Sequence, residues 1–377
     1  MRILMTSSWF PSRKHSTLGN FVQRHIEAIA TMHEVVVLVW FRLDQGEGIE
    51  VVKSVENGVT IYRVYSAHRK WQWWKANAAL GVGWAAINQD GIGSFDVVHH
   101  HVTFPIGIQA AVLADEIKAP LVVTEHWTIY NKQVRRDQPI GLKRLSMRVL
   151  AQAKVICPVS EDLAATMQAY GLAGNYQVIP NVVDTEAFQI GTPANGFHFL
   201  HISSLDDRHK NISGILLAWS EVCSKIPGAV LHIGGDGPHL HWSDAAMRMG
   251  IPSESIEFFG ECSVAEVAQR MRQAHCLVMF SRFENLPVVI VEAMAAGLPI
   301  ITSDVGGISE HVHKERGMLV QSEREDELQA ALLSMPALWS TYDRQRIRAY
   351  AQKHFSRESV ARQYDAVYRA AIGNGKD

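Results

Sequence analysis

The sequence predicts an α/β protein built from two doubly wound parallel sheets in series. Short apolar runs of strand length alternate with segments of helical period, which is the pattern of βαβ units. The alternation restarts near the middle of the chain, and a length of 377 residues favours two cores over one. A polar segment punctuated by Gly191, Pro193 and Gly196 separates the two series and predicts a linker.

Six short apolar runs in the first series predict strands, and the segments between them predict crossover helices. Val22, His25 and Ile26 fall on one apolar stripe of the first such helix. Asn57-Gly58 is a strong two-residue turn signal and predicts a hairpin. The six predicted strands are residues 2–6, 34–40, 96–100, 120–124, 154–159 and 177–180.

The second series repeats the pattern and ends in a helix. Residues 356–371 place Val360, Tyr364, Val367 and Tyr368 on one face at spacings of three and four, which predicts a helix with one buried side. The predicted strands are residues 197–203, 229–234, 255–259, 277–280, 299–302 and 318–320.

Composition excludes several classes of protein. A net charge of −2 does not suggest a nucleic-acid partner. No apolar run is long enough to span a bilayer, and the apolar run at the N-terminus is too short for a signal peptide. We therefore expect a cytoplasmic protein.

Two acids stand in the mostly apolar segment 281–299. A predicted strand precedes Glu284, whereas Glu292 falls on a helix that Pro287 opens and Gly297 ends. Glu284 therefore lies at the carboxyl end of a strand, where open α/β sheets bind ligands, and a helix N-terminus there suits a phosphate. Because burying an unpaired charge is costly, Glu292 needs a partner, which a polyhydroxyl ligand would supply.

This segment resembles the signature of the family-4 retaining glycosyltransferases, also called glycosyl transferases group 1. That signature has two glutamates with seven residues between them, and here Ala-Met-Ala-Ala-Gly-Leu-Pro follows Glu292. Three further segments resemble the family in its own order, so the resemblance covers nearly the whole chain. They are the inter-domain passage at residues 178–188, the glycine turn at 233–238 and the loop that closes the donor site at 302–310.

The resemblance implies the GT-B fold, in which two Rossmann-like domains face a central cleft. It implies an N-terminal acceptor domain of residues 1–183, which the C-terminal helix at residues 356–377 rejoins. Residues 184–355 would then form the domain that binds the nucleotide-sugar donor.

The resemblance also implies roles for individual residues. Glu284, His126 and Lys210 are the expected catalytic residues, with Lys210 on the diphosphate of the donor, Glu284 near its hexose and His126 facing donor and acceptor. Glu292 is expected to accept hydrogen bonds from the ribose hydroxyls. The expected donor-binding set is Glu292, Lys210, Arg208, Gly19, Asn285 and Leu286.

The chain departs from the family pattern at two places. Ser204 stands where the family usually has an arginine, six positions before the lysine, and Arg208 is a candidate replacement from the same loop. Asn285-Leu286-Pro287 stands where the family commonly has Gly-Phe-Gly, and proline cannot donate a hydrogen bond. The contacts to the sugar must therefore differ, which leaves its identity open.

Two clusters stay open to more than one interpretation. Strand alternation puts His99 and His101 on the face opposite His100, and packing or cleft lining is favoured there over a metal site. Residues 68–75, which include Trp71, Trp73 and Trp74, either meet a lipid headgroup interface or pack against the sheet.

The function implied by the resemblance is sugar transfer with retention. A hexose-type sugar would move from a nucleotide sugar, expected to be UDP-linked, to a glycan or lipid-linked acceptor in bacterial surface polysaccharide or glycolipid synthesis. The alternatives are a sugar-nucleotide epimerase of the same fold and a non-catalytic sugar-binding module. We expect no cofactor besides the nucleotide sugar as co-substrate, no metal ion, and peripheral contact with the inner membrane face if the acceptor is a lipid.

Overall fold

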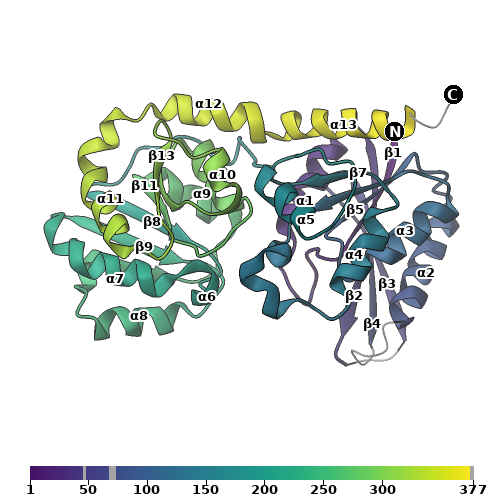
Figure 1. Cartoon of the computed structure of the whole chain (residues 1–377), viewed down its shortest axis with the longest axis horizontal. Helices are drawn as coiled ribbons and strands as arrows, with labels where there is room; N and C mark the ends of the chain where they lie inside the picture. The colour runs from purple at the N-terminus through teal and green to yellow at the C-terminus, as the bar shows by residue number, and fades with distance from the viewer. Residues whose placement is uncertain (46–47, 68–73, 374–377) are drawn as a thin grey trace. The chain divides into compact units, whose positions relative to one another are not determined.

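A computed structural model describes residues 1–45, 48–67 and 74–373 of the chain (Figure 1). Internal contacts divide it into two units. Unit 1 contains Met1–Val182 together with the C-terminal segment that begins at Arg357, and unit 2 contains Val183–Ser356. The chain therefore leaves unit 1 once and returns to it once. Val183 and Ser356, the residues at these two crossings, form an isolated bridge.

The described part of unit 1 has a seven-stranded sheet in the order β3-β4-β2-β1-β5-β6-β7. Only β3 and β4 pair in antiparallel fashion, as the hairpin predicted at Asn57-Gly58, and the other pairs in the described residues are parallel. The strands are β1 (Arg2–Ser7), β2 (Glu34–Leu43), β3 (Ile49–Glu56), β4 (Val59–Ala67), β5 (Val97–His101), β6 (Leu121–Glu125) and β7 (Ala153–Pro158).

Helices cover both faces of this sheet (Figure 1). The core of one face joins α1 and α13 to the sheet, with Val22 and Ile26 of α1 packed in the same cluster as Tyr364 and Tyr368 of α13. The apolar face predicted for the last helix is therefore buried. The helices are α1 (Asn20–Ala30), α2 (Trp74–Gln89), α3 (Gly107–Glu116), α4 (Leu142–Leu150), α5 (Glu161–Ala169) and α13 (Arg357–Gly373).

Unit 2 has a six-stranded parallel sheet in the order β10-β9-β8-β11-β12-β13. Its strands are short, and β11 and β12 are buried throughout, as expected of a sheet covered on both faces. They are β8 (Phe197–Ile202), β9 (Ala229–Gly234), β10 (Ile256–Phe259), β11 (Cys276–Met279), β12 (Ile300–Ser303) and β13 (Gly317–Val320).

Trp219 of α7 lies at the centre of the unit 2 core, fully buried against Phe199 of β8. Helices α7, α8 and α11 contribute to this core, and α10 packs against α12. The helices are α6 (Asp207–Lys210), α7 (Ile212–Val222), α8 (His239–Arg248), α9 (Val264–Gln273), α10 (Val288–Ala295), α11 (Glu325–Leu338) and α12 (Arg344–Phe355).

The α/β class and the two doubly wound sheets predicted from the sequence are confirmed. The strand predicted at residues 177–180 is wrong. This segment runs beside β7, with Gln177 and Ile179 donating backbone hydrogen bonds to it, but it forms only a single bridge. Pro180 has no N–H with which to extend that ladder.

Candidate functional site

The chain order of unit 2 reverses between β8 and β11. From β8 the chain builds outward through β9 and β10, and from β11 it builds the other way through β12 and β13. In open α/β sheets, ligands bind at the carboxyl ends of the strands beside such a reversal. The segment after β8 carries Lys210, and the segment after β11 carries Glu284, so two predicted site residues flank this point.

Lys210 and Glu284 form a buried ion pair. The ammonium Nζ of Lys210 lies 2.5 Å from Oε1 of Glu284, and the two side chains are 12% and 6% exposed. The hydroxyl of Ser281 donates to the same oxygen at 2.8 Å. His209 lies 3.5 Å from the other oxygen and stacks on Phe283. Glu284 is thus held by a cation and a hydroxyl, with an imidazole close by.

These contacts lower the pKa of Glu284 to about 2. Burial alone would raise the pKa, but the positive charge of Lys210 and the nearby imidazole of His209 outweigh it. A carboxylate whose pKa is lower in the folded state stabilises the fold above its ordinary pKa, and that stabilisation is lost as the pH falls toward 2. At neutral pH Glu284 is therefore a carboxylate and an acceptor only.

Arg282 joins the two segments of this site. Its guanidinium donates to the carbonyl of Asp207 and, at 2.6 Å, to Oδ1 of Asn211, while its backbone N–H donates to the carbonyl of His209. Asn211 has left-handed backbone angles and caps α7, which separates α7 from the single turn of α6. Lys210 therefore ends a separate turn that is held against Glu284.

Two glycines allow neighbouring loops to lie in close backbone contact with the segments that form the site. A Cβ on Gly306, whose φ is +57°, would lie 2.0 Å from the carbonyl oxygen of Glu284. A Cβ on Gly235, with φ +133°, would lie 1.8 Å from the oxygen of Ser203. The two loops that resemble the family therefore need glycine at these contacts, because no other side chain fits.

The remaining predicted residues of unit 2 lie in the same region. Asn285 and Leu286 are buried directly after Glu284, and the carbonyl of Asn285 accepts from the N–H of Gly307. Glu292 is 6% exposed in the second turn of α10, and Arg208 is exposed on α6. Pro287 caps α10 rather than entering its first turn.

Unit 1 has its own reversal, between β1 and β5. Gly19 precedes α1 in the long connection after β1, with φ +78°, and a Cβ there would lie 2.6 Å from the backbone of Trp9. Gly19 is thus required by a close approach of two backbone segments. That approach fixes the path of the loop at this edge of the sheet.

Glu125 shapes the segment that carries His126 at the carboxyl end of β6. One carboxylate oxygen accepts the N–H groups of His126 and Trp127, at 2.9 and 3.0 Å. The other accepts the N–H of Thr103 and the hydroxyl of Tyr130, at 3.1 and 3.2 Å. This fully buried acid therefore fixes the backbone on both sides of the predicted catalytic histidine.

The ring of His126 is packed among other rings. It stacks on His101 and lies edge-on to His25, with centroid distances of 5.4 and 5.1 Å, and it contacts Phe21 at 4.7 Å. Burial lowers the pKa of His126 well below its usual range, which the charge of a protonated His25 would lower further. His126 is accordingly a neutral imidazole at neutral pH.

Within each unit the structure brings predicted residues together, but sequence reasoning missed their supports. Glu125, Ser281, Arg282 and His209 escaped notice because their importance lies in contacts across the fold. An acid directly after a buried strand was the one available signal for Glu125. The Trp71–Trp74 segment lies outside the described side chains, and the described residues contain no group of three His, Cys, Asp or Glu that could hold a metal.

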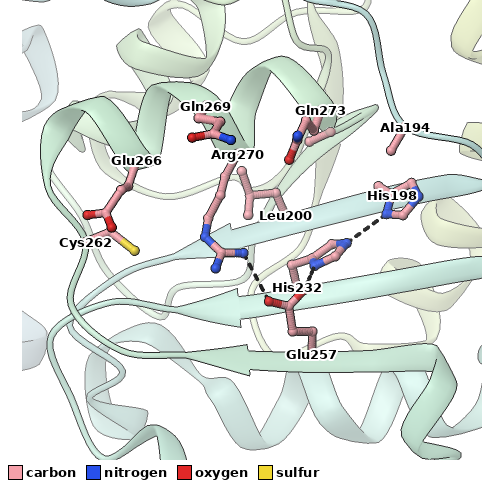
Figure 2. A pocket seen from close by; sticks show the side chains of 11 residues that line it. Ala194, His198, Leu200, His232, Glu257, Cys262, Glu266, Gln269, Arg270 and Gln273 are labelled. Carbon is pink, nitrogen blue, oxygen red and sulfur yellow. Dashed lines mark hydrogen bonds and ion pairs between the residues drawn. The ribbon is translucent and has the colours of Figure 1, made fainter.

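A cavity of about 380 Å³ lies elsewhere in unit 2, between α9 and the face of β8, β9 and β10 (Figure 2). His232 lies 2.8 Å from His198 and 2.6 Å from Glu257, which also pairs with Arg270. None of the predicted site residues lines this cavity. Its charged groups already pair with one another, so we assign it no ligand.

Comparisons with known proteins agree with the fold. The family model "Glycosyltransferase Family 4" matches residues 18–187, and "Glycosyl transferases group 1" matches residues 182–354. The phosphatidyl-myo-inositol mannosyltransferase of Mycobacterium tuberculosis is 29% identical over 299 residues, which cover 75% of this chain and 76% of that protein.

Solved structures show the same fold along the whole chain. Sucrose-phosphate synthase from Thermosynechococcus elongatus superposes with a TM-score of 0.79 at 18% identity, covering 100% of both chains. HepE from Anabaena, solved in complex with UDP, superposes with a TM-score of 0.73 at 16% identity, covering 97% of this chain and 99% of that one. These neighbours are glycosyltransferases of the GT-B fold.

The chain belongs to the family-4 glycosyltransferases, the group whose two models together match residues 18–354. It is thus a glycosyltransferase with two Rossmann-like units.

Proposed function

We propose that this glycosyltransferase moves a hexose-type sugar from a UDP-sugar to a glycan or lipid-linked acceptor, with retention of configuration. The observation that carries the proposal is the buried Lys210–Glu284 pair at the reversal point of unit 2. The pair is held at the two positions where the family resemblance expects a contact to diphosphate and a contact to sugar.

In this proposal Lys210 stabilises the leaving nucleoside diphosphate. Charge develops on that group as the glycosidic bond breaks, and a fixed cation beside a helix N-terminus opposes it. A bound diphosphate would draw Lys210 partly away from Glu284, which would then accept hydrogen bonds from the sugar hydroxyls. Glu292 would accept from the ribose, and no metal ion would be needed.

Two similar proteins support the choice of donor and acceptor. HepE was solved with UDP, which supports a UDP-linked donor. The mannosyltransferase of phosphatidyl-myo-inositol supports a lipid-linked acceptor. No described helix is both long enough and apolar enough to cross a membrane. We place the reaction in the cytoplasm, with a lipid acceptor reached at the inner membrane face. Attack on the same face of the sugar as the departing phosphate accounts for retention without a protein nucleophile.

The test is a panel of UDP- and GDP-sugars scored for released nucleotide, with and without acceptor vesicles that contain phosphatidylinositol or with a soluble glycan. We expect UDP release that depends on acceptor, persists in chelator and is lost in Glu284→Gln, with the anomeric configuration kept. Interconversion of sugar nucleotides without acceptor would instead identify an epimerase, and binding without turnover a sugar-binding module. Activity restored only by added magnesium or manganese would contradict the metal-independent mechanism.

A further inference from the structure

Unit 1 has a cluster of four histidines, of which His126 is the one with an exposed part. His25, His99 and His101 are fully buried, whereas His126 is partly exposed. Such groups are costly to bury without hydrogen bonds, so their partners indicate what the cluster does.

A chain of hydrogen bonds connects His25 to the C-terminal helix α13. His25 Nε2 lies 3.2 Å from Oδ1 of Asn181, and His25 Nδ1 lies 3.1 Å from the hydroxyl of Tyr364. The amide oxygen only accepts, so Nε2 carries the proton. Because burial lowers the pKa of His25 to about 4, its ring is neutral and Nδ1 accepts from the Tyr364 hydroxyl. His25 is therefore held in one tautomer.

This series of hydrogen bonds continues from Tyr364 to Tyr368, and every bond in it donates toward His25. The Tyr364 oxygen lies 3.0 Å from Thr124 Oγ1, which lies 2.7 Å from Nε2 of His99. Nδ1 of His99 lies 2.7 Å from the hydroxyl of Tyr368. Since Tyr364 donates to His25, Thr124 donates to Tyr364, His99 to Thr124 and Tyr368 to His99. Tyr368 is thus the first donor of the series. Asn181 is its last acceptor, and because its amide oxygen can only accept, it fixes the direction of all the bonds.

His101 and His126 fix each other's tautomer. Nδ1 of His101 lies 3.1 Å from Nε2 of His126. In a hydrogen bond between two neutral imidazoles, one facing nitrogen carries the proton and the other accepts it. The tautomer of His126 is therefore the complement of that of His101, and replacing His101 removes this constraint.

We propose that His101 and Tyr364 are positioning residues that hold His126 in a single ring orientation and a single tautomer. The proposal rests on the proposed function and on the role that the family resemblance implies for His126, which is to face donor and acceptor. His101 acts through its hydrogen bond to Nε2, and Tyr364 acts by fixing His25, whose ring lies edge-on to His126. Helix α13, the last element of the chain, thereby contributes to the site of unit 1.

Tyr364→Phe and Tyr368→Phe form a matched pair for the test. Each removes one buried hydroxyl from the same helix and keeps the ring, but only Tyr364→Phe opens the chain beside His25. We expect Tyr364→Phe to lower kcat about tenfold, the equivalent of one hydrogen bond, with the donor KM unchanged. Tyr368→Phe should keep the parent kcat. Equal losses of kcat in both variants would overturn the proposal.

The tautomers themselves are measured by nitrogen-15 NMR of the histidine rings in the full chain. Tyr364→Phe should shift the Nδ1 signal of His25, which loses its donor, and the signals of His126, whereas Tyr368→Phe should shift only His99. This measurement needs no turnover, so it separates failure of the positioning role from failure of the proposed function. Unchanged His25 and His126 signals in Tyr364→Phe would overturn the proposal even if kcat fell.

His101 is tested by rescue. His101→Asn can place an amide group, which both donates and accepts, near the position of Nδ1, whereas His101→Leu removes the hydrogen-bond partner of His126. We expect His101→Asn to retain most of the kcat and the single His126 tautomer, and His101→Leu to lose both. If the leucine variant does not fold, the tyrosine pair still decides. A folded leucine variant with parental His126 signals would contradict the role of His101.

Discussion

At the scale of single residues, the main feature of the unit 2 site is that the charge of Glu284 is paired with that of Lys210. Lys210, Ser281 and His209 all lie against the carboxylate of Glu284. Glu292 sits separately in the second turn of α10. Loss of Glu284 would therefore release Lys210 to a diphosphate, whereas loss of Glu292 would remove an acceptor without freeing that cation.

We predict that Glu292→Ala weakens binding of free UDP more than Glu284→Ala does. A hydrogen bond to a charged group typically contributes about 1.5–3 kcal/mol, so the Glu292 variant should lose roughly ten- to hundredfold in affinity. Glu284→Ala should bind UDP about as well as the parent chain or better. Isothermal calorimetry with UDP measures both. If Glu292→Ala binds UDP as tightly as the parent chain, Glu292 does not bind the nucleotide.

At the scale of elements, α13 completes the core of unit 1. Its buried residues Val360, Tyr364 and Tyr368 belong to the same core as Ile26 and Ile29 of α1. A buried apolar side chain contributes about 1.5–3 kcal/mol, so losing a row of them approaches the net stability of about 5–15 kcal/mol of a domain. The helix is part of the domain and not an appendage.

We predict that a chain ending at Ser356 loses the cooperative thermal transition of unit 1 and keeps that of unit 2. Within the full chain, Tyr364→Ala should cost about 3–5 kcal/mol, as large-to-small changes of buried aromatics do. Arg362→Ala, on the exposed face of the same helix, should change stability by less than about 0.5 kcal/mol. Differential scanning calorimetry resolves the two transitions. A shortened chain that melts like the parent would show that α13 does not support unit 1.

The elements were largely predictable from the sequence, and the contacts within the site were not. The apolar run predicted at residues 277–280 corresponds to β11 because a sheet covered on both faces leaves a continuous apolar run. The Lys210–Glu284 pair joins residues 74 apart in the chain, and no local pattern encodes it. The sequence marked His25 only as a member of an apolar stripe, although a polar residue on a buried face is itself a signal of a hydrogen-bonded partner.

At the scale of the whole molecule, buried histidines determine the response to acid. Burial lowers the pKa of His25 and His100 in unit 1, and of His201, His275 and His311 in unit 2, to about 4 in each case. Below their ordinary pKa of 6.5 these groups take up protons in the unfolded chain but not in the folded one. Stability is therefore greatest above pH 6.5 and falls as the pH drops toward 4.

We predict that unit 1 is the more acid-labile of the two. Each such histidine removes about 1.4 kcal/mol of stability per pH unit within this window. Besides His25 and His100, unit 1 has His99, His101 and His126, whose pKa burial holds well below the usual range, whereas unit 2 has His201, His275 and His311. Unit 1 should therefore lose stability more steeply. Urea unfolding between pH 7 and pH 5, with each transition fitted separately, measures the slopes. His100→Asn should reduce the slope of unit 1 by one proton, and equal slopes for the two units would contradict the prediction.

The two crossings at Val183 and Ser356 also have a consequence for synthesis on the ribosome. Unit 2 is one continuous segment, so it can fold as soon as that segment has left the exit tunnel. Unit 1 is begun first but finished last, because its core waits for α13. Until then the apolar side of α1 has no cover and is open to chaperones and to association with other nascent chains. The half of the chain that is translated first is therefore the half that depends longest on protection.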